Sequence, residues 1–322
     1  MQIPLGATWV RFPRFVGDAV MQLPILRLLR QMGIGPIVVY GPDLTVSMVK
    51  DHELADVVVA ETEKKGILDL FKVLKQHRAA RSIHFTKSLR PAVAAWLADV
   101  PERIGVSDGG LALFNTHHAP FWTESGPFVM RYHAALARRW SDLPPPPYAN
   151  YVSATHVDKP NNNYICLMPG SLWPSKLWPV EHFQELARKA EQSNLDIVIL
   201  GTASERELGN AILQNNHGHN LCGRTDLRQA AAWLHGAVAA IGNDSGLSHL
   251  AAACGTRVIS IYGPTDPSGS APWGPKVIVL KAKDLVCSPC FKRQCPLPRR
   301  NCLADILPTQ VWEQYSSSVF CS

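Results

Sequence analysis

The stretch Ile241-Gly-Asn-Asp-Ser-Gly-Leu-Ser-His-Leu-Ala-Ala-Ala-Cys-Gly255 decides the fold of this chain, because it passes from an apolar segment through a polar turn into small residues. The apolar residues 237–241 predict a buried strand. Asp244 and Ser245 are good N-cap residues, so a helix is expected to begin there. Backbone N–H groups left free at a helix start favour an anion such as phosphate. An ordinary strand-to-helix turn with a capping aspartate is the alternative interpretation.

Two further residues of this stretch could face the same ligand. Gly246 lets a ligand approach the backbone closely. His249 lies about one helical turn beyond Ser245, so the two side chains are expected on the same side of the helix.

A second strand, loop and helix follow one another between Tyr164 and Phe183. In the loop, Gly170 permits close approach of the backbone, Ser171 offers a hydroxyl, and Lys176 supplies a point charge suited to a diphosphate. A solvated loop lysine is the alternative interpretation of Lys176. The G-x-x-x-x-G-K-[ST] pattern does not occur in this loop, so a P-loop is not predicted.

The third motif lies near the amino end, where residues 7–30 pass from a short strand through a basic loop into a helix. Asp18 follows Gly17 at the predicted helix start. A carboxylate there can cap the helix and complement its dipole. At the mouth of a cleft it can instead act as a general base that removes a proton from a hydroxyl nucleophile. The residues leave both roles open.

The alternation of strand-like and helical sequence patterns predicts two α/β domains. Strand-like and helical patterns alternate through the first part of the chain, which indicates βαβ units and a parallel sheet. A proline run and a polar segment then place a boundary within residues 143–162, and a second α/β set follows. We therefore expect Rossmann-like domains at 1–150 and 151–306, with a helix in 307–322. Ligands of such sheets bind beyond the carboxyl ends of the strands, where all three motifs turn.

In combination, the three motifs resemble the ADP-heptose:lipopolysaccharide heptosyltransferases, glycosyltransferase family 9, in which two Rossmann-like domains face each other across a cleft (the GT-B fold). The resemblance spans nearly the whole chain and is nearer to heptosyltransferase II than to heptosyltransferase I. It rests on Gly17-Asp18, Pro169-Gly170-Ser171, Lys176-Leu-Trp-Pro179, Asn243-Asp-Ser-Gly246 and Tyr262-Gly-Pro-Thr-Asp-Pro267.

This resemblance implies an inverting, metal-independent glycosyltransferase that moves a heptose from ADP-L-glycero-D-manno-heptose to the inner core of lipopolysaccharide without a cofactor. Asp18 would be the general base, and Lys176 would stabilise the departing diphosphate. The helix in 307–322 would pack back on the N-terminal domain. The implied donor-binding residues are Gly170, Ser171, Lys176, Asp244, Ser245, Gly246 and His249.

Departures from the family keep other functions open. Leu172 stands where heptosyltransferase I has a second hydroxyl residue, and Ala203 stands where that branch has an acidic residue near the ribose. Glu205 is close by, but it also completes a capping box. The chain could therefore use another nucleotide sugar on a cell-envelope or protein acceptor, or bind a nucleotide sugar without turnover. Retention of Asp18 and Lys176 argues against a pure binding protein.

Charge and hydropathy suggest where the protein works. The net charge is +6, and Arg11, Arg14, Lys87 and Arg90 fall in or near N-terminal loops, where they would meet an anionic acceptor or membrane headgroups. Scattered solvated charge is an equal alternative. No apolar run reaches the roughly 18 residues of a membrane span, and no signal-peptide pattern opens the chain, so a cytoplasmic protein is expected, with peripheral contact at the inner membrane as an option. A nucleic-acid partner is not expected.

Four cysteines near the carboxyl end need a separate interpretation. Cys287, Cys290, Cys295 and Cys302 are spaced C-x2-C-x4-C-x6-C, and four such thiols could hold zinc or a cluster. The spacing is not that of two C-x2-C knuckles, and the family's chemistry needs no metal. No metal is therefore predicted, and a structural metal stays the alternative to reduced or redox-labile thiols. Three other cysteines are expected to be buried thiols: Cys166, Cys222 and Cys254.

Overall fold

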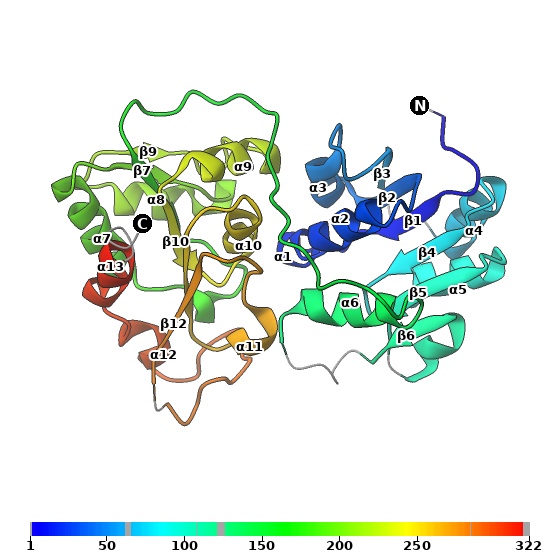
Figure 1. Ribbon diagram of the computed structural model, residues 1–322. Helices are drawn as coiled ribbons and strands as arrows, with labels where there is room; N and C mark the ends of the chain where they lie inside the picture. The colour runs from blue at the N-terminus through cyan, green and yellow to red at the C-terminus, as the bar shows by residue number, and fades with distance from the viewer. Residues whose placement is uncertain (1, 62–65, 108, 121–125, 284, 318–322) are drawn as a thin grey trace. The chain divides into compact units, whose positions relative to one another are not determined.

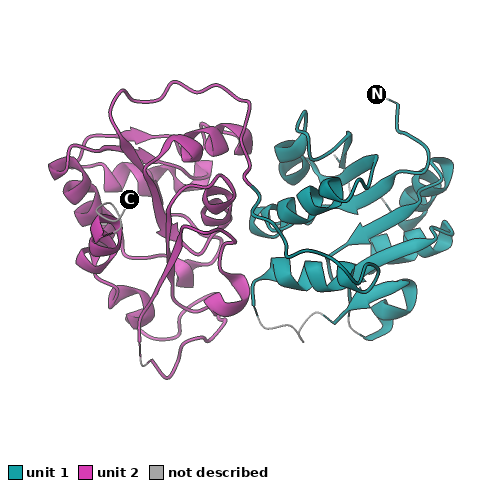
Figure 2. Cartoon of the chain, viewed as in Figure 1, with its two compact units in different colours: residues 1–149 teal, residues 150–322 magenta. Residues whose placement is uncertain are grey.

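The computed structural model describes residues 2–61, 66–107, 109–120, 126–283 and 285–317. The chain divides into two compact units, residues 1–149 and 150–322 (Figure 2). Each unit contains a six-stranded sheet in which neighbouring strands run parallel. The predicted α/β class with Rossmann-like sheets is confirmed.

The first unit has the strand order β3-β2-β1-β4-β5-β6, so the chain reverses its direction of travel between β1 and β4 (Figure 1). Its strands are β1 (Thr8–Arg11), β2 (Ile37–Pro42), β3 (Val57–Glu61), β4 (Arg81–His84), β5 (Glu102–Val106) and β6 (His117–Ala119). Its helices are α1 (Val16–Val20), α2 (Leu23–Gln31), α3 (Asp43–Val46), α4 (Ile67–Gln76), α5 (Leu89–Leu97) and α6 (Phe128–Ala137), with short 3-10 turns η1 (Ser47–Val49) and η2 (Gly109–Phe114).

The second unit repeats this plan with the order β12-β11-β10-β7-β8-β9, and its reversal lies between β7 and β10. Its strands are β7 (Tyr164–Met168), β8 (Asp196–Ile199), β9 (His219–Asn220), β10 (Ala239–Asn243), β11 (Val258–Tyr262) and β12 (Val277–Lys281). Its helices are α7 (Val180–Gln192), α8 (Arg206–Ile212), α9 (Leu227–Gly236), α10 (Gly246–Ala253), α11 (Pro267–Ser270), α12 (Asn301–Ala304) and α13 (Pro308–Ser317), with 3-10 turns η3 (Pro174–Lys176) and η4 (Ala203–Glu205).

Apolar strand residues explain the core of the second unit. Ile165 and Leu167 alternate on β7 so that both pack on one face, where they meet Phe183 and Leu186 of α7. The carboxyl-terminal helix α13 buries Val311 in the same core, against α7 and β11. Its predicted contact with the N-terminal domain stays a prediction. Within the described ranges, no helix is long and apolar enough to cross a bilayer.

Close packing between β7 and β10 makes a glycine necessary at 242. A methyl group at Gly242 would overlap the carbonyl oxygen of Met168, its strand partner, and would lie 2.6 Å from the Cβ of that residue. Backbone atoms in the middle of a sheet cannot give way easily, so the contact requires the smaller side chain.

We predict that Gly242→Ala lowers the thermal unfolding midpoint by about 5 °C, because overpacking of this kind costs roughly 1–3 kcal/mol. Gly110→Ala is the matched control, since no atom lies within 4 Å of a Cβ placed there. Differential scanning calorimetry of both variants measures the effect. A Gly242→Ala midpoint equal to that of Gly110→Ala would contradict the packing argument.

Candidate active site

The turn after β10 and the loop after β7 lie together at the carboxyl edge of the second sheet. Asn243 is fully buried at the end of β10 and joins the two. Its side-chain amide donates to the carbonyl of Pro169 at 2.6 Å, and its side-chain oxygen accepts from the backbone N–H of Trp178 at 3.0 Å. These strands flank the reversal of strand order, which is where open α/β sheets bind ligands.

Lys176 and Asp244 form an ion pair across this edge. The Lys176 Nζ lies 2.5 Å from Asp244 Oδ2, and the side chains are only 16% and 6% exposed. Thr265, after β11, donates its hydroxyl to the same carboxylate oxygen at 2.7 Å. The Lys176 ammonium also lies 4.9 Å from the centre of the Trp173 ring. Lys176 is thus a largely buried, paired cation rather than a solvated loop lysine.

The helix start beside this pair is arranged for an anion. Ser245 is the N-cap of α10, and its side chain makes no capping bond. Its Oγ is buried and, among the described residues, has no hydrogen-bond partner. Gly246 begins the helix, so the free N–H groups of the first turn lie next to the Lys176–Asp244 pair. A phosphate oxygen placed here could accept from the serine hydroxyl and from those N–H groups.

His249 stays neutral in this site. It is 8% exposed, and burial lowers the pKa of its imidazole to about 4, with the Lys176 cation acting in the same direction and Asp244 against both. Its Nδ1 has no partner within the described part of the chain. A neutral ring can donate or accept one hydrogen bond to a ligand, but it adds no positive charge near neutral pH.

The loop after β7 places the predicted small residues beside an acidic side chain. Gly170 is buried, and a Cβ at that position would collide with the carboxylate of Glu205. Glu205 accepts a hydrogen bond from the backbone N–H of Thr202 at 2.7 Å, so the expected capping box is present. Ser171 accepts a long bond of 3.4 Å from the backbone of Trp173. Glu205 therefore both caps η4 and lies at the edge of the candidate site.

Asp18 belongs to the first unit and lies in the first turn of α1, directly after the loop from β1. The N-cap of this helix is Phe15, so Asp18 is not the capping residue itself. Burial raises the pKa of the Tyr132 phenol well above its usual value, and the Asp18 carboxylate adds to that rise, which places the two side chains near each other. Asp18 is only half-buried, which suits a base that must meet a substrate hydroxyl.

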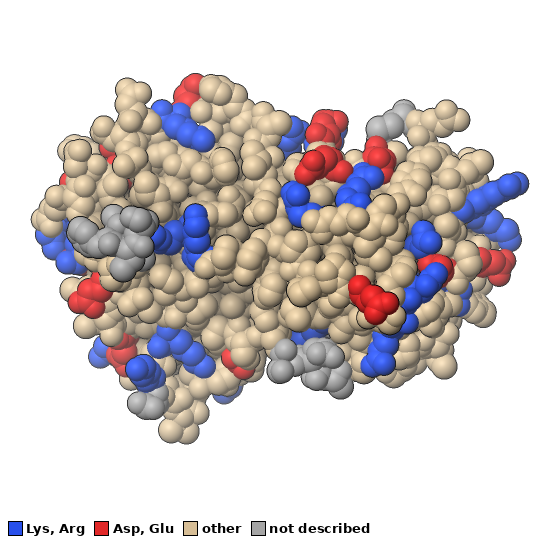
Figure 3. Space-filling view, in the orientation of Figure 1, with Lys and Arg blue, Asp and Glu red and all other residues tan. Residues whose placement is uncertain are grey.

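The four predicted acceptor-binding cations fall into two groups. Arg11 and Arg90 both bind the Glu61 carboxylate, at 3.0 and 2.9 Å, and all three side chains are at most 14% exposed. Arg14 and Lys87 are exposed. Positive and negative side chains are interspersed on the visible face of the molecule (Figure 3). The ion pairs leave one net positive charge among the three buried groups.

The cysteines divide as the sequence indicated. Cys166, Cys222 and Cys254 are buried free thiols, as predicted. The clustered cysteines Cys287, Cys290, Cys295 and Cys302 are free as well. Burial raises the pKa of the Cys302 thiol, and Cys295, Cys287 and Cys290 are near enough to raise it further. In the part of the chain that the structure describes, no three His, Cys, Asp or Glu side chains are arranged as the ligands of a metal ion.

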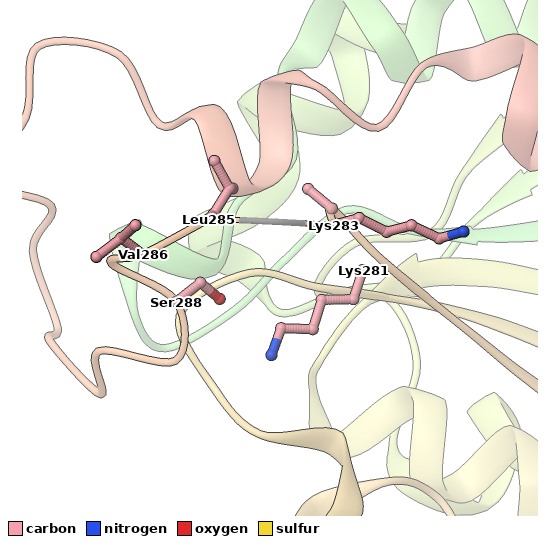
Figure 4. Close-up of a pocket in the computed structure, with 6 residues that line it drawn as sticks. Lys281, Lys283, Leu285, Val286 and Ser288 are labelled. Carbon is pink, nitrogen blue, oxygen red and sulfur yellow. The ribbon is translucent and has the colours of Figure 1, made fainter.

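A separate surface depression lies at the carboxyl end of β12 (Figure 4). It contains none of the predicted site residues. Figure 4 shows the ammonium groups of Lys281 and Lys283 pointing in different directions, so they do not converge on one anion. Its lining residues are Lys281, Ala282, Lys283, Leu285, Val286 and Ser288.

Sequence reasoning missed two contributors to the site. Thr265 belongs to the Tyr262–Pro267 motif, which was recognised without assigning that hydroxyl a role. Asn243 precedes the recognised aspartate, and its bonds to Pro169 and Trp178 depend on residues distant in sequence. The position of Thr265 in a recognised motif could have pointed to its role in the site. No sequence pattern could have predicted that Asn243 bonds to Pro169 and Trp178.

We predict that stability falls as the pH drops from about 6.5 towards 4, because the buried His249 and His84 both have a pKa near 4 while unfolded histidines take up protons near 6.5. The unfolded state binds more protons between these pH values, so each of the two histidines lowers the free energy of unfolding by up to about 1.4 kcal/mol per pH unit. Denaturant midpoints measured at each pH should decline less steeply for His249→Gln. The exposed His156→Gln is the control, and an unchanged slope in His249→Gln would overturn the assignment.

We predict that Glu61→Gln destabilises the protein by about 3 kcal/mol, since it leaves two buried guanidinium groups without their carboxylate. Glu53→Gln is the control, because the Glu53 side chain, which pairs with Arg27, is 72% exposed. Loss of such an exposed ion pair should lower the free energy of unfolding by less than about 1 kcal/mol. Urea denaturation compares the two variants. Similar losses in both would show that the Glu61 pairs contribute little.

Comparison with known proteins agrees with this geometry. The family model for glycosyltransferase family 9 (heptosyltransferase) matches residues 67–300. The chain is 28% identical over 308 residues to lipopolysaccharide heptosyltransferase 2 of Escherichia coli, covering 84% of this chain and 86% of that protein. It is 24% identical over 316 residues to lipooligosaccharide heptosyltransferase 2 of Campylobacter jejuni, covering 95% and 96%.

Solved structures share the fold. The structure of E. coli ADP-heptose lps heptosyltransferase II superposes with a TM-score of 0.78 at 24% identity, covering 98% of both chains. The E. coli heptosyltransferase WaaC with ADP gives a TM-score of 0.78 at 19% identity, covering 96% of this chain and 99% of the other. Both likenesses support the GT-B fold. Since the family model matches well over half of the sequence, the chain belongs to glycosyltransferase family 9, the heptosyltransferase family.

Proposed function

We propose that this protein transfers a heptose from ADP-L-glycero-D-manno-heptose to the inner core of lipopolysaccharide, with inversion at the anomeric carbon. The relatives named as heptosyltransferase 2 support this reaction, as does the chain's membership of the family. The observation that carries the proposal is the buried Lys176 ammonium beside Asp244 at the start of α10, where a donor diphosphate would bind.

In the proposed reaction, the acceptor hydroxyl attacks the anomeric carbon as the bond from that carbon to the diphosphate oxygen breaks. The proton of the hydroxyl passes to the carboxylate of Asp18, and the electron pair of the broken bond leaves with ADP. Asp18 fits this role because it is partly exposed in the first turn of α1, after β1. A single displacement inverts the configuration and needs no covalent enzyme intermediate.

The leaving diphosphate gains negative charge as it departs, and the second unit supplies groups to stabilise it. Lys176 has two further N–H bonds after its contact with Asp244. The hydroxyls of Ser171 and Ser245 and the N–H groups from Gly246 onwards provide further donors. Loss of one such preorganised donor typically costs about a hundredfold to a thousandfold in rate. His249 would bind the diphosphate or the sugar as a neutral ring, and Gly170 would let the donor approach the loop.

The positive charge of Lys176 and the α10 helix start would take the place that a divalent cation has in metal-dependent transferases. On the acceptor side, the exposed Arg14 and Lys87 would meet anionic groups of the lipopolysaccharide core. Arg11 and Arg90 would contribute the single net charge that their pairs with Glu61 leave. The lipid anchor of the acceptor would bring the enzyme to the inner membrane surface, on its cytoplasmic side.

Another nucleotide sugar is the second candidate donor, and the surroundings of Glu205 favour testing it. The Glu205 carboxylate accepts a hydrogen bond from the backbone N–H of Thr202. Ala203 has no acidic side chain that could bind the ribose of the donor nucleotide. Release of nucleoside diphosphate from a panel of ADP-, GDP- and UDP-sugars would identify the donor.

The decisive experiment measures acceptor-dependent ADP release from ADP-heptose with truncated lipopolysaccharide. Asp18→Asn should lower kcat by about 10²–10⁴-fold while the donor still binds, because it removes a base and leaves the diphosphate site intact. Lys176→Met should lower kcat/KM by about 10²–10³-fold. Lys189→Met is the control, since that lysine of α7 contacts only a surface glutamate among the ion pairs described.

Thermal melts must accompany these assays, because Lys176→Met leaves a buried carboxylate without its cation. Full activity in Asp18→Asn would refute its role as base. If wild type binds ADP-heptose but releases no ADP with any core acceptor, the heptosyltransferase proposal fails in favour of another acceptor or a binding protein.

A further inference from the structure

Residues 285–300, called here the connecting segment, lie between β12 and α12 and form no helix or strand. Hydrophobic burial contributes little to the position of this segment, since Val286 is fully exposed, Phe291 is 58% exposed and Leu297 is 50% exposed. Hydrogen bonds connect it instead to two other loops of the second unit.

The first of these loops is the turn after β11. The carbonyl of Pro264 accepts hydrogen bonds from the backbone N–H groups of Cys290 and Phe291, at 3.0 and 2.8 Å. Thr265 is the next residue of that turn, and its hydroxyl donates to Asp244 at 2.7 Å. The connecting segment is therefore bound directly beside the residue that supports the Asp244 carboxylate.

The second loop is η3, whose last residue is the lysine of the candidate site. Ser175 lies just before that lysine and is only 3% exposed. Its hydroxyl donates to the carbonyl of Lys292 at 2.6 Å, and its backbone N–H donates to the carbonyl of Arg293 at 3.2 Å. At the end of the connecting segment, Arg300 donates to the carbonyl of Pro174 at 2.5 Å. These three hydrogen bonds attach η3 to the connecting segment.

One carboxylate oxygen also joins the two loops. Asp244 Oδ2 accepts from Lys176 at 2.5 Å and from Thr265 at 2.7 Å. The Trp173 ring, just before η3, has the Lys176 ammonium 4.9 Å and the Arg293 guanidinium 5.8 Å from its centre. The two loops are therefore linked twice, once through Asp244 and once through the connecting segment.

A lysine needs such support if its ammonium is to stay in one place. The four-carbon side chain is flexible, so an ion pair with one carboxylate oxygen does not by itself fix the backbone of the loop. The turn η3 has only three residues, and the hydrogen-bond geometry of a 3-10 turn is poor. The bonds to Pro174 and Ser175 hold the part of the loop that its own backbone bonds hold weakly.

We propose that the connecting segment positions Lys176 for the donor diphosphate, and that Ser175 is the positioning residue through which it acts. The hydroxyl and the N–H of Ser175 are both bonded to the connecting segment, so this residue acts through Lys176 rather than on the donor itself. In a preorganised site, a displacement of about 1 Å can lower the rate by about 10²-fold. The effect on turnover rests on the proposed function, whereas the attachment of η3 does not.

The first measurement follows the chemical reactivity of the Lys176 amine. The full chain is treated briefly with acetic anhydride, and acetylation at Lys176 is quantified by mass spectrometry. The Lys176 side chain is 16% exposed and paired, so the wild type should react slowly. Ser175→Ala removes the hydroxyl that bonds to Lys292, so η3 should open more often and Lys176 should be acetylated several-fold faster.

Thr256→Val is the matched control for this measurement. Thr256 is 6% exposed, and its hydroxyl donates to the carbonyl of Leu234 at 2.7 Å, which is a buried bond of the same kind. Thr256 precedes β11, so it lies at the amino edge of the sheet, opposite the candidate site. This variant should also lose a buried hydrogen bond, but its Lys176 should be acetylated at the wild-type rate.

The second measurement is acceptor-dependent ADP release. Ser175→Ala should lower kcat/KM for the donor by about tenfold, because the ammonium no longer meets the departing diphosphate in one position. The KM for the acceptor should not change. In a Lys176→Met background, Ser175→Ala should cause no further loss, because the group that it positions is already absent.

Equal acetylation of Lys176 in Ser175→Ala and Thr256→Val would overturn the proposal, as would an equal loss of kcat/KM with and without Lys176. If Ser175→Ala fails to fold, Arg300→Met takes its place, since it removes the bond to Pro174 and leaves Ser175 intact. Acetylation requires no substrate, so the two proposals can fail separately. Faster acetylation in Ser175→Ala, with a wild type that releases no ADP, would support the positioning of Lys176 and contradict only the heptosyltransferase proposal.

Discussion

The ion pair between Lys176 and Asp244 is the interaction on which the second unit's candidate site depends. Two charges that are 16% and 6% exposed have lost much of their hydration, which must be offset by close geometry and by hydrogen bonds to the remaining lone pairs. The Thr265 hydroxyl supplies one of these. The pair joins the loop after β7 to the turn after β10, so it fixes the position of the cation and of the α10 helix start together.

The first unit also has a buried ion-pair cluster, but this one carries a net positive charge. Glu61 at the end of β3 holds Arg11 from β1 and Arg90 from α5, so one carboxylate neutralises only part of two guanidinium groups. In both units the charged groups gather at the carboxyl ends of parallel strands. Side chains from separate strands converge there because every strand of a parallel sheet ends at the same edge. The sequence patterns that end each strand therefore become neighbours in space.

The sheets and their motifs could be predicted because their signals are local. Each apolar run is bounded by a polar or glycine-containing turn, and the order of strands and helices alternates regularly, so the α/β class follows from patterns within about ten residues. The contacts of Asn243 could not be predicted in this way. Its partners Pro169 and Trp178 lie more than sixty positions earlier, and only strand order brings them near. The same holds for Arg11 and Arg90, which looked like available cations until Glu61 was found between them.

By itself, the sequence determined the two α/β units, the three strand-to-helix turns and the family, because these are recorded in spacing, composition and short motifs. Tertiary structure alone decided which charges are paired and which histidine is kept neutral. The physical reason is the distance along the sequence over which each interaction acts. Periodicity and capping act between residues close in sequence, whereas burial, ion pairing and pKa shifts depend on atoms that are brought together only when distant segments pack.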